Sequence, residues 1–323
     1  MEANAEFNRD IRELELQIDR LQELAQARGL DAGGELKALE SKLAQLKERT
    51  PRPLTAMERV QLARHPQRPF TLDYVERIFT DFTELHGDRA FRDDQSIVGG
   101  WARLDGRTVM VVGHQRGRDM KENLLRNFGM PHPEGYRKAL RLMHLADKFR
   151  HPVITIIDTP GAYPGMGAEE RGQAEAIARN LREMAALRVP SISVVIGEGG
   201  SGGALALGVT DRILMLENAV YSVITAEGCA AILWKTAEAK EKAAAALKLT
   251  APDLVELGIV DEVILEAGGG AHLDWDGTAE NVKHTLTRHL AELAEMDPED
   301  RRRARWTKYE SMGSWQEPEE HTT

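Results

Sequence analysis

The spacing of apolar positions separates a helical N-terminal segment from a longer α/β body. Apolar residues recur three and four apart from Ile11 to Leu21 and again from Leu36 to Leu46, with a glycine-containing break between the two runs. This period is that of an amphipathic helix, so residues 1–50 are predicted to form a helical hairpin. Each arm covers only about two heptads, which is too short for a stable free-standing coiled coil. We therefore expect the hairpin to pack against the body or against a partner subunit.

Uninterrupted apolar runs in the body predict buried strands that alternate with helices. Strands without polar alternation imply a mostly parallel sheet with both faces covered. Asp105 and Gly106, between two β-rich runs, are a typical two-residue hairpin turn. Strands are predicted over residues 97–104, 108–114, 152–157, 189–196, 212–216 and 258–264, and helices over residues 57–92 (with a proline turn), 136–149, 168–187, 227–234, 236–249, 251–257 and 278–296.

Two turn-rich loops follow consecutive strands of this predicted sheet. The first spans residues 158–165, and the second, residues 197–208, consists half of glycine. Ligands of parallel sheets bind beyond the carboxyl ends of the strands, so the two loops are expected to face one site. Glycine removes the Cβ and allows positive φ, which lets the second loop aim several amide groups at one point. Such a loop holds negative charge, either on a phosphate or on an oxyanion that develops during a reaction.

Composition and charge narrow the functional classes. The chain of 323 residues carries a formal net charge of −10, which argues against general nucleic-acid binding. The basic run from Arg301 to Arg305 is predicted to be a solvated helix face, and residues 298–323 are predicted to form a C-terminal tail. A single cysteine, Cys229, excludes a disulfide within the chain and a multi-cysteine zinc site. The histidines are scattered, and we expect no metal in this chain.

The cellular location is predicted from the same features. No apolar stretch is long enough for a membrane span, and the acidic N-terminus lacks the apolar core of a signal peptide. A lone cysteine also fits a reducing compartment. The sequence therefore predicts a cytoplasmic protein without a membrane segment.

Several motifs suggest other chemistry. The glycine loop formally matches the dinucleotide fingerprint G-x-G-x-x-G, and Glu217 follows 20 residues after its start. Only about eight residues separate Gly202 from Asp211, however, which is too few for the full crossover helix of that fold. No Gly-Lys-Ser/Thr sequence is present, which excludes a P-loop. Ser201 and Cys229 are weaker candidates for a nucleophile.

A cluster of basic residues, Arg116, Arg118 and Lys121, follows directly after a predicted strand. Two interpretations stay open for it. The cluster is either a solvated loop or an anion clamp for a carboxylate or for the phosphates of a bulky substrate.

Long contiguous motifs place the chain near a known family. It closely resembles the α subunit of the bacterial acetyl-CoA carboxylase carboxyltransferase over residues 55–275, with a similar hairpin before them. Departures are small, with Met120 where the family usually has threonine and Ala226 where it usually has proline. The resemblance rests on GHQRGR (113–118), KEN (121–123), RNFGMP (126–131), PEGYRKAL (133–140), IDTPGAYPG (157–165), GAEERGQ (167–173), the glycine loop, YSVI (221–224), EGCAAILWK (227–235) and GGAH (269–272).

The resemblance implies a crotonase-like (ClpP/crotonase) α/β fold, a superhelix of ββα units, over residues 51–297. It also implies transfer of a carboxyl group from carboxybiotin to acetyl-CoA, which gives malonyl-CoA in the first committed step of fatty acid synthesis. Biotin would arrive on a biotin carboxyl carrier protein, after a biotin carboxylase has loaded it. The expected partner is a zinc-containing β subunit in an α2β2 complex.

The resemblance also assigns residues to roles. Gly202 and Gly203 would supply the oxyanion-hole amides that face the biotin ureido carbonyl. Gly161 and Ala162 on the neighbouring loop are candidates for further backbone contacts. Arg116, Arg118 and Lys121 are candidates for substrate binding.

Two competing functions belong to different classes. A self-sufficient crotonase-type acyl-CoA hydratase or hydrolase would need a side-chain acid or base in the pocket, for which Glu198 is the candidate. A non-catalytic dinucleotide-binding module would instead use the glycine loop for a pyrophosphate. Dependence on biotin and a partner subunit separates the carboxyltransferase from both.

Overall fold

The computed structural model describes residues 54–313, together with positions 21, 34, 36, 37, 39, 41 and 42 of the N-terminal segment. Those isolated positions are helical, and the rest of the predicted hairpin lies outside the described residues. The chain divides into two compact units, Met1–Glu58 and Arg59–Thr323. Both candidate loops belong to the second unit, whose architecture follows.

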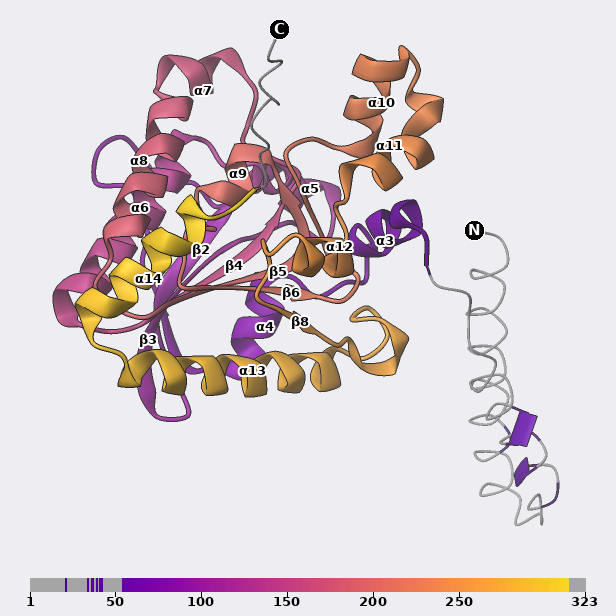
Figure 1. Ribbon diagram of the computed structural model, residues 1–323, viewed down its shortest axis with the longest axis horizontal. Helices are drawn as coiled ribbons and strands as arrows, with labels where there is room; N and C mark the ends of the chain where they lie inside the picture. Colours follow the sequence, from indigo (N-terminus) through magenta and orange to yellow (C-terminus); the bar gives the residue numbers. More distant parts are fainter. Residues whose placement is uncertain are drawn as a thin grey trace, which may run out of the picture. The chain divides into compact units, whose positions relative to one another are not determined.

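An eight-stranded sheet forms the centre of this unit (Figure 1). It is mostly parallel, as the sequence predicts, and it contains two strands, β1 and β7, besides the six predicted ones. The first three strands pair in antiparallel fashion, and all later pairs are parallel. The short strand β7 pairs with the carboxyl end of β5. In spatial order the strands are β1 (Thr80–Glu84), β2 (Ile97–Leu104), β3 (Arg107–His114), β4 (Val153–Thr159), β5 (Ser191–Gly200), β6 (Arg212–Leu216) and β8 (Glu262–Ile264), with β7 (Val220–Ser222) off this path.

Helices cover both faces of the sheet. Helices α6 and α8 pack against each other on one face, and α4 and α13 pack together on the other (Figure 1). Helices α10 and α11 pair with each other and stand beyond the end of the sheet. The helices are α3 (Ala56–Ala63), α4 (Thr71–Ile78), α5 (Met120–Leu125), α6 (Pro133–Phe149), α7 (Met166–Glu170), α8 (Gln173–Ala186), α9 (Ser201–Leu205), α10 (Ala226–Trp234), α11 (Lys240–Leu247), α12 (Ala251–Glu256), α13 (Trp275–Glu295) and α14 (Pro298–Glu310).

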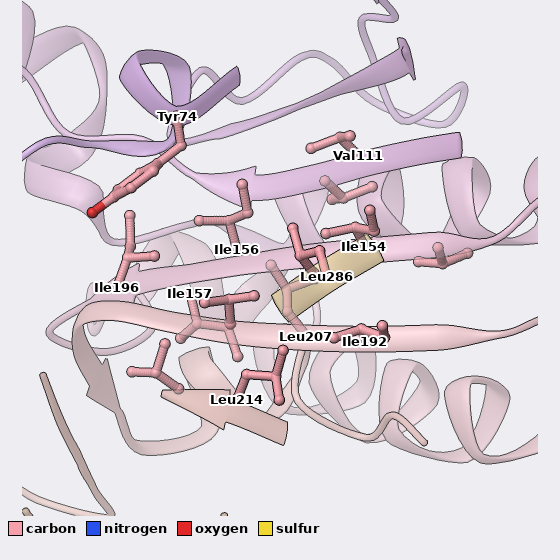
Figure 2. Close-up of a cluster of buried hydrophobic side chains, with 14 of the residues drawn as sticks. Tyr74, Val111, Ile154, Ile156, Ile157, Ile192, Ile196, Leu207, Leu214 and Leu286 are labelled. Atoms are coloured by element: carbon pink, nitrogen blue, oxygen red, sulfur yellow. The ribbon is translucent and has the colours of Figure 1, made fainter. Parts of the chain in front are cut away.

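The core lies on both faces of the central parallel strands. Every residue of β4 is buried, which explains its continuous apolar character, because a parallel strand packs helices on each side. Figure 2 shows Val111 of β3 above Ile154, its register partner on β4, with Tyr74 of α4 and Leu286 of α13 near the same strands. This rigid sheet fixes the positions of the loops at its carboxyl edge.

Local predictions succeed where turn chemistry is strong. Asp105 and Gly106 have φ of +48° and +81°, the left-handed values that a two-residue hairpin needs, and they join β2 to β3. The prediction of helix throughout residues 57–92 is wrong in part, because residues 80–84 form the edge strand β1. The exposed residues of this strand are polar. The long helix predicted over residues 168–187 is two helices, since Gly172 adopts φ of +83° between them.

The prediction of a solvated basic face at Arg301 to Arg305 is also wrong in part. Residues 298–310, within the predicted tail, form helix α14, and Arg301 and Arg305 are buried while Arg303 is exposed. Arg305 pairs with Asp211 at 2.8 Å and donates to the carbonyl oxygen of Met184 at 2.6 Å. One side of the run is buried because α14 packs against the C-terminal end of α8.

Candidate active site

The glycine loop begins as a strand and ends as a helix. Strand β5 continues to Gly200, four residues beyond its predicted end, because Glu198 to Gly200 pair with β7. Ser201 then adopts φ of +54°, a left-handed conformation that is uncommon for a residue with a side chain, and starts α9. Gly202 and Gly203 lie in the first turn of α9, so their amide groups have no acceptor within that helix.

The loop after β4 lies directly against the glycine loop. A Cβ at Gly203 would stand 2.7 Å from the amide nitrogen of Ala162 and equally close to the carbonyl carbon of Gly161. A Cβ at Gly200 would overlap the carbonyl oxygen of Pro160. The structure therefore brings Gly161, Ala162, Gly202 and Gly203 together, at the place where the sequence puts a single site.

The two loops differ in how much space they leave. Gly161 and Gly203 are buried, whereas Ala162 and Gly202 are partly exposed. The nearest atoms to a Cβ on Gly202 would be the methyl groups of Ile177 at 3.6 Å, an ordinary contact distance. A ligand can therefore approach the backbone at Gly202 without displacing a side chain.

Neutral aromatic groups form the wall behind α9. The hydroxyl of Tyr136 would lie 3.0 Å from a Cβ on Gly203, and Tyr136 and His114 are both fully buried. Burial lowers the pKa of His114 to about 3 and raises the pKa of Tyr136 well above its usual value. Both groups are uncharged at neutral pH, so the amides of the glycine loop face no competing counter-charge from this wall.

A buried charge network supports the glycine loop from the other side. Arg116 reaches Glu198 at 2.8 Å and Asp158 at 3.2 Å through the same Nη2 atom. Arg64 reaches Glu198 at 2.7 Å and Glu227 of α10 at 2.8 Å. The backbone amide of Glu198 donates to Asp158 at 3.0 Å, so the loop and the end of β4 are tied together.

The carboxyl groups of this network respond differently to their burial. Burial raises the pKa of Asp158, although Arg116 opposes that shift. Burial acts on Glu198 in the same direction, but Arg116 and Arg64 outweigh it and the pKa of Glu198 is lowered. Sequence reasoning missed Arg64, Asp158 and Glu227, and only the position of Asp158 at a strand end gave a signal.

The structure separates the three predicted basic residues. Arg116 points inward into the network, and its side chain is 16% exposed. Arg118 donates to the carbonyl oxygen of Arg68 at 2.9 Å, pairs with Asp73 and lies over the ring of Phe70 at 4.0 Å. Lys121 is exposed on α5. The three cations do not converge on one anion, and their role in substrate binding stays a prediction.

Metal and membrane features are limited within the part of the chain that the structure describes. No group of three or more His, Cys, Asp or Glu side chains there is arranged to hold a metal ion. None of the helices in that part is both long and apolar enough to cross a membrane. Cys229 is buried on α10 as a free cysteine.

Comparisons with known sequences agree closely. The model of a family described as "acetyl co-enzyme A carboxylase carboxyltransferase-like" matches residues 4–313. A relative from Gemmatimonas aurantiaca is 60% identical over 97% of this chain and 98% of its own length, and one from Thermus thermophilus is 56% identical over 97% and 99%. Both relatives are named acetyl-coenzyme A carboxylase carboxyl transferase subunit alpha.

Comparisons with solved structures show the fold. The transcarboxylase 12S core has a TM-score of 0.58 at 20% identity, covering 79% of this chain but 44% of that one. The β subunit of Pseudomonas aeruginosa geranyl-CoA carboxylase has a TM-score of 0.56 at 19% identity, covering 76% and 45%. A Pseudomonas malonate decarboxylase hetero-tetramer has a TM-score of 0.56 at 20% identity, covering 68% and 88%. These likenesses confirm the crotonase-like α/β fold.

Proposed function

This chain belongs to the α subunits of the acetyl-coenzyme A carboxylase carboxyltransferase family, and on that premise we propose that its two facing loops serve the biotin half of a carboxyl transfer. The overall reaction moves a carboxyl group from carboxybiotin to acetyl-CoA and gives malonyl-CoA. The contact between Gly203 and the Gly161–Ala162 backbone carries the proposal, since it brings the first turn of α9 and the loop after β4 to one partly open point, where the amide of Gly161 donates to Thr159 Oγ1 at 3.0 Å.

The site fits the group that the family implies. Biotin on its carrier supplies a ureido carbonyl, whose oxygen gains negative charge as the carboxyl group leaves. The first-turn amides of Gly202 and Gly203 would donate hydrogen bonds to such an oxygen, and each preorganised donor is worth about 3 kcal/mol by analogy with other oxyanion holes. Gly161 and Ala162 hold the glycine loop close and add backbone groups to the same wall. The neutral, buried Tyr136 and His114 keep water from the back of the loop.

The rest of the reaction requires partners. We assign the acetyl half of the reaction to a zinc-containing β subunit, which forms an α2β2 complex with this chain. A biotin carboxylase loads biotin on a biotin carboxyl carrier protein, and the carrier brings it to the complex. We place all of these proteins in the cytoplasm. Gly202 is only partly buried in this chain, which supports the proposal that a second subunit covers it. The exposed Lys121, and Arg118 beside it in the sequence, are the candidates for contacts with the coenzyme phosphates.

The competing hydratase or hydrolase is not favoured. It would use Glu198 as an acid or base, yet two arginines hold this carboxylate and lower its pKa. A carboxylate of lowered basicity that already accepts two charged donors is a poor proton acceptor. Membership of the family favours the carboxyltransferase over a dinucleotide-binding module as well.

The proposed function is tested by reconstitution with the β subunit. We expect the two subunits together, and neither alone, to catalyse biotin-dependent decarboxylation of malonyl-CoA. Gly203→Val should lower kcat by at least about 100-fold, the scale for loss of an oxyanion-hole donor, because the new side chain meets the backbone of Gly161 and Ala162.

A matched control separates this effect from general damage. Gly167→Val on the nearby helix α7 meets only the flexible end of Arg171 and should leave kcat within about twofold. Full activity of the isolated chain, or near-normal turnover by a correctly assembled Gly203→Val complex, would refute the proposal.

A further inference from the structure

We propose that Glu198 is a positioning residue. Arg64 and Arg116 each bind one of its carboxylate oxygens, and this fixes the loop so that the amides of Gly202 and Gly203 point at the reacting oxygen. The inference rests on the proposed function of the glycine loop. It assigns Glu198 no contact with substrate and no proton to move. Glu198, which the sequence offers as a candidate acid or base, instead fixes the backbone of a glycine-rich segment.

The loop needs an anchor because glycine supplies none. Between Ile196 and Ser201, Glu198 is the only residue with a side chain. Glycine has more conformational freedom to lose than any other residue, so a run of glycines holds its amides in place only if something else fixes the backbone. Oxyanion stabilisation depends on donors that are already in place when charge develops. Within residues 197–200, only the side chain of Glu198 can bind other segments and fix the backbone.

Both carboxylate oxygens of the buried Glu198 side chain accept a hydrogen bond from an arginine. Glu198 Oε1 accepts from Arg64 Nε at 2.7 Å, and Oε2 accepts from Arg116 Nη2 at 2.8 Å. The side chain of Glu198 is 9% exposed. Charge-assisted hydrogen bonds of this length are stronger than neutral ones. Because Arg64 directly follows α3 and Arg116 follows β3, movement of the loop relative to these two segments would stretch the bonds.

The backbone of the same residue is fixed independently. Its amide donates to Asp158, and the carboxylate of Asp158 lies so close to Gly197 that a Cβ there would overlap it. Arg116 also pairs with Asp158. The end of β4 and the start of the glycine loop are thus held as one unit, and the two loops that form the site share it.

The ion pairs extend to the α10–α11 pair. Arg64 continues from Glu198 to Glu227 in the first turn of α10. A small cavity of about 20 Å³ lies between the loop and the start of this helix, bordered by Arg64, Glu198 and Thr225. Since the helices α10 and α11 stand beyond the sheet, this chain of ion pairs is a direct physical link from them to the glycine loop (Figure 1).

The positioning role is tested in the reconstituted complex with the β subunit. Glu198→Gln keeps the shape of the side chain and removes its charge. We expect kcat for biotin-dependent malonyl-CoA decarboxylation to fall by about 10- to 100-fold, the scale for a misplaced catalytic group, with KM values for both substrates within about twofold. The loss should be the same from pH 6.5 to 8.5, whereas removal of a general base would change the pH profile.

A double-mutant cycle tests the ion pair as a unit. Arg64→Gln should lower kcat by about tenfold alone, yet by less than about twofold in the Glu198→Gln background, because Arg64 acts on the loop through Glu198. Multiplicative losses in the double variant would overturn the inference. Arg64 is 31% exposed, so this variant keeps the test decisive even if Glu198→Gln fails to fold, and an unchanged kcat would then overturn the inference.

A buried aspartate elsewhere provides the control. Asp211→Asn removes a charge of similar burial at the opposite end of β5, and we expect it to lower Tm with kcat within about twofold. An equal loss of kcat in Asp211→Asn would show that general destabilisation explains both variants. An inactive wild-type complex would refute the proposed function, whereas an active complex with an unaffected Glu198→Gln refutes the positioning role alone.

Discussion

The two ends of the central parallel strands hold similar buried ion pairs in different surroundings. At the amino end, Arg305 pairs with Asp211, and Asp211 also accepts from the amide and hydroxyl of Ser191 at 2.8 and 3.0 Å. At the carboxyl end, Arg116 is shared between Asp158 and Glu198. The first pair ties helix α14 to the sheet, whereas the second ties two loops to each other.

The difference lies in what each pair supports. Around Arg305 the partners lie at the ends of packed elements, because Asp211 directly precedes β6 and the other acceptors are carbonyl oxygens at the end of α8 and just after it. Around Arg116 the partners Asp158 and Glu198 lie near the carboxyl ends of β4 and β5, just before the chain turns into loops that carry backbone amides into a partly open site. The same interaction therefore serves stability at one end of the sheet and preorganisation at the other. Ligand sites of parallel sheets lie at the carboxyl end for this reason of topology.

The largest effect is expected at the amino end. Arg305→Met removes the shorter of the two ion pairs of the buried Asp211 and leaves Arg301 at 4.0 Å, and breaking a buried pair costs about 3–5 kcal/mol of unfolding free energy. Urea denaturation should show this loss, while kcat of the folded complex stays within about twofold. Arg303→Met, an exposed arginine on the same helix, should change the unfolding free energy by less than about 0.5 kcal/mol.

A loss of turnover in folded Arg305→Met protein would break the comparison. It would mean that the amino end also controls the geometry of the loops. The unfolding free energy and kcat must therefore be measured on the same preparation, at a temperature where the variant is folded.

Sequence reasoning predicted the fold better than it predicted the support of the site. Apolar runs such as that of β4 mark buried parallel strands, and Asp105-Gly106 marks a hairpin, because both signals are local. The meeting of Gly161 with Gly203 followed from the rule that loops after parallel strands share one edge. The assignment of Gly202 and Gly203 as oxyanion-hole donors came from family resemblance and stays a prediction.

The features that sequence reasoning missed depend on contacts between distant segments. Arg64 and Glu198 are 134 positions apart, and Arg305 and Asp211 are 94 apart. No local pattern separates Arg305, which is buried, from Arg303, which is exposed. Their environments differ only because α14 packs on α8, and the polar edge strand β1 was missed because its pairing with β2 decides its conformation.

A smaller effect concerns acid stability at the carboxyl end. The pKa of Glu198 is lowered in the folded state, so its charge contributes stability that is present above the unfolded value of about 4.3 and is lost as pH falls through the folded pKa. The difference in unfolding free energy between wild type and Glu198→Gln should therefore be constant at neutral pH and shrink below about pH 4.3. Denaturation curves at several pH values measure it.

Asp158 sharpens this prediction because its shift has the opposite sign. Burial raises the pKa of Asp158, so its folded state gains protons before its unfolded state does as pH falls. Protonation of Asp158 offsets part of the acid loss from Glu198. In Asp158→Asn that offset disappears, and the unfolding free energy should fall more steeply with acidification than in wild type. An unchanged slope would contradict the assigned coupling.

The smallest effect is expected from the neutral wall behind the glycine loop. Among the described residues, the buried hydroxyl of Tyr136 has no hydrogen-bond partner. Because an unsatisfied buried group costs free energy, Tyr136→Phe should leave the unfolding free energy unchanged or raise it by up to about 1 kcal/mol. If the wall acts on Gly203 through shape and dryness alone, kcat should also stay within about twofold. Tyr136→Ala, which removes the ring, serves as the contrast and should lower both quantities. A tenfold loss of kcat in Tyr136→Phe with unchanged stability would instead give the hydroxyl a direct part in holding the loop, and the carboxyl end would then have a second anchor besides Glu198.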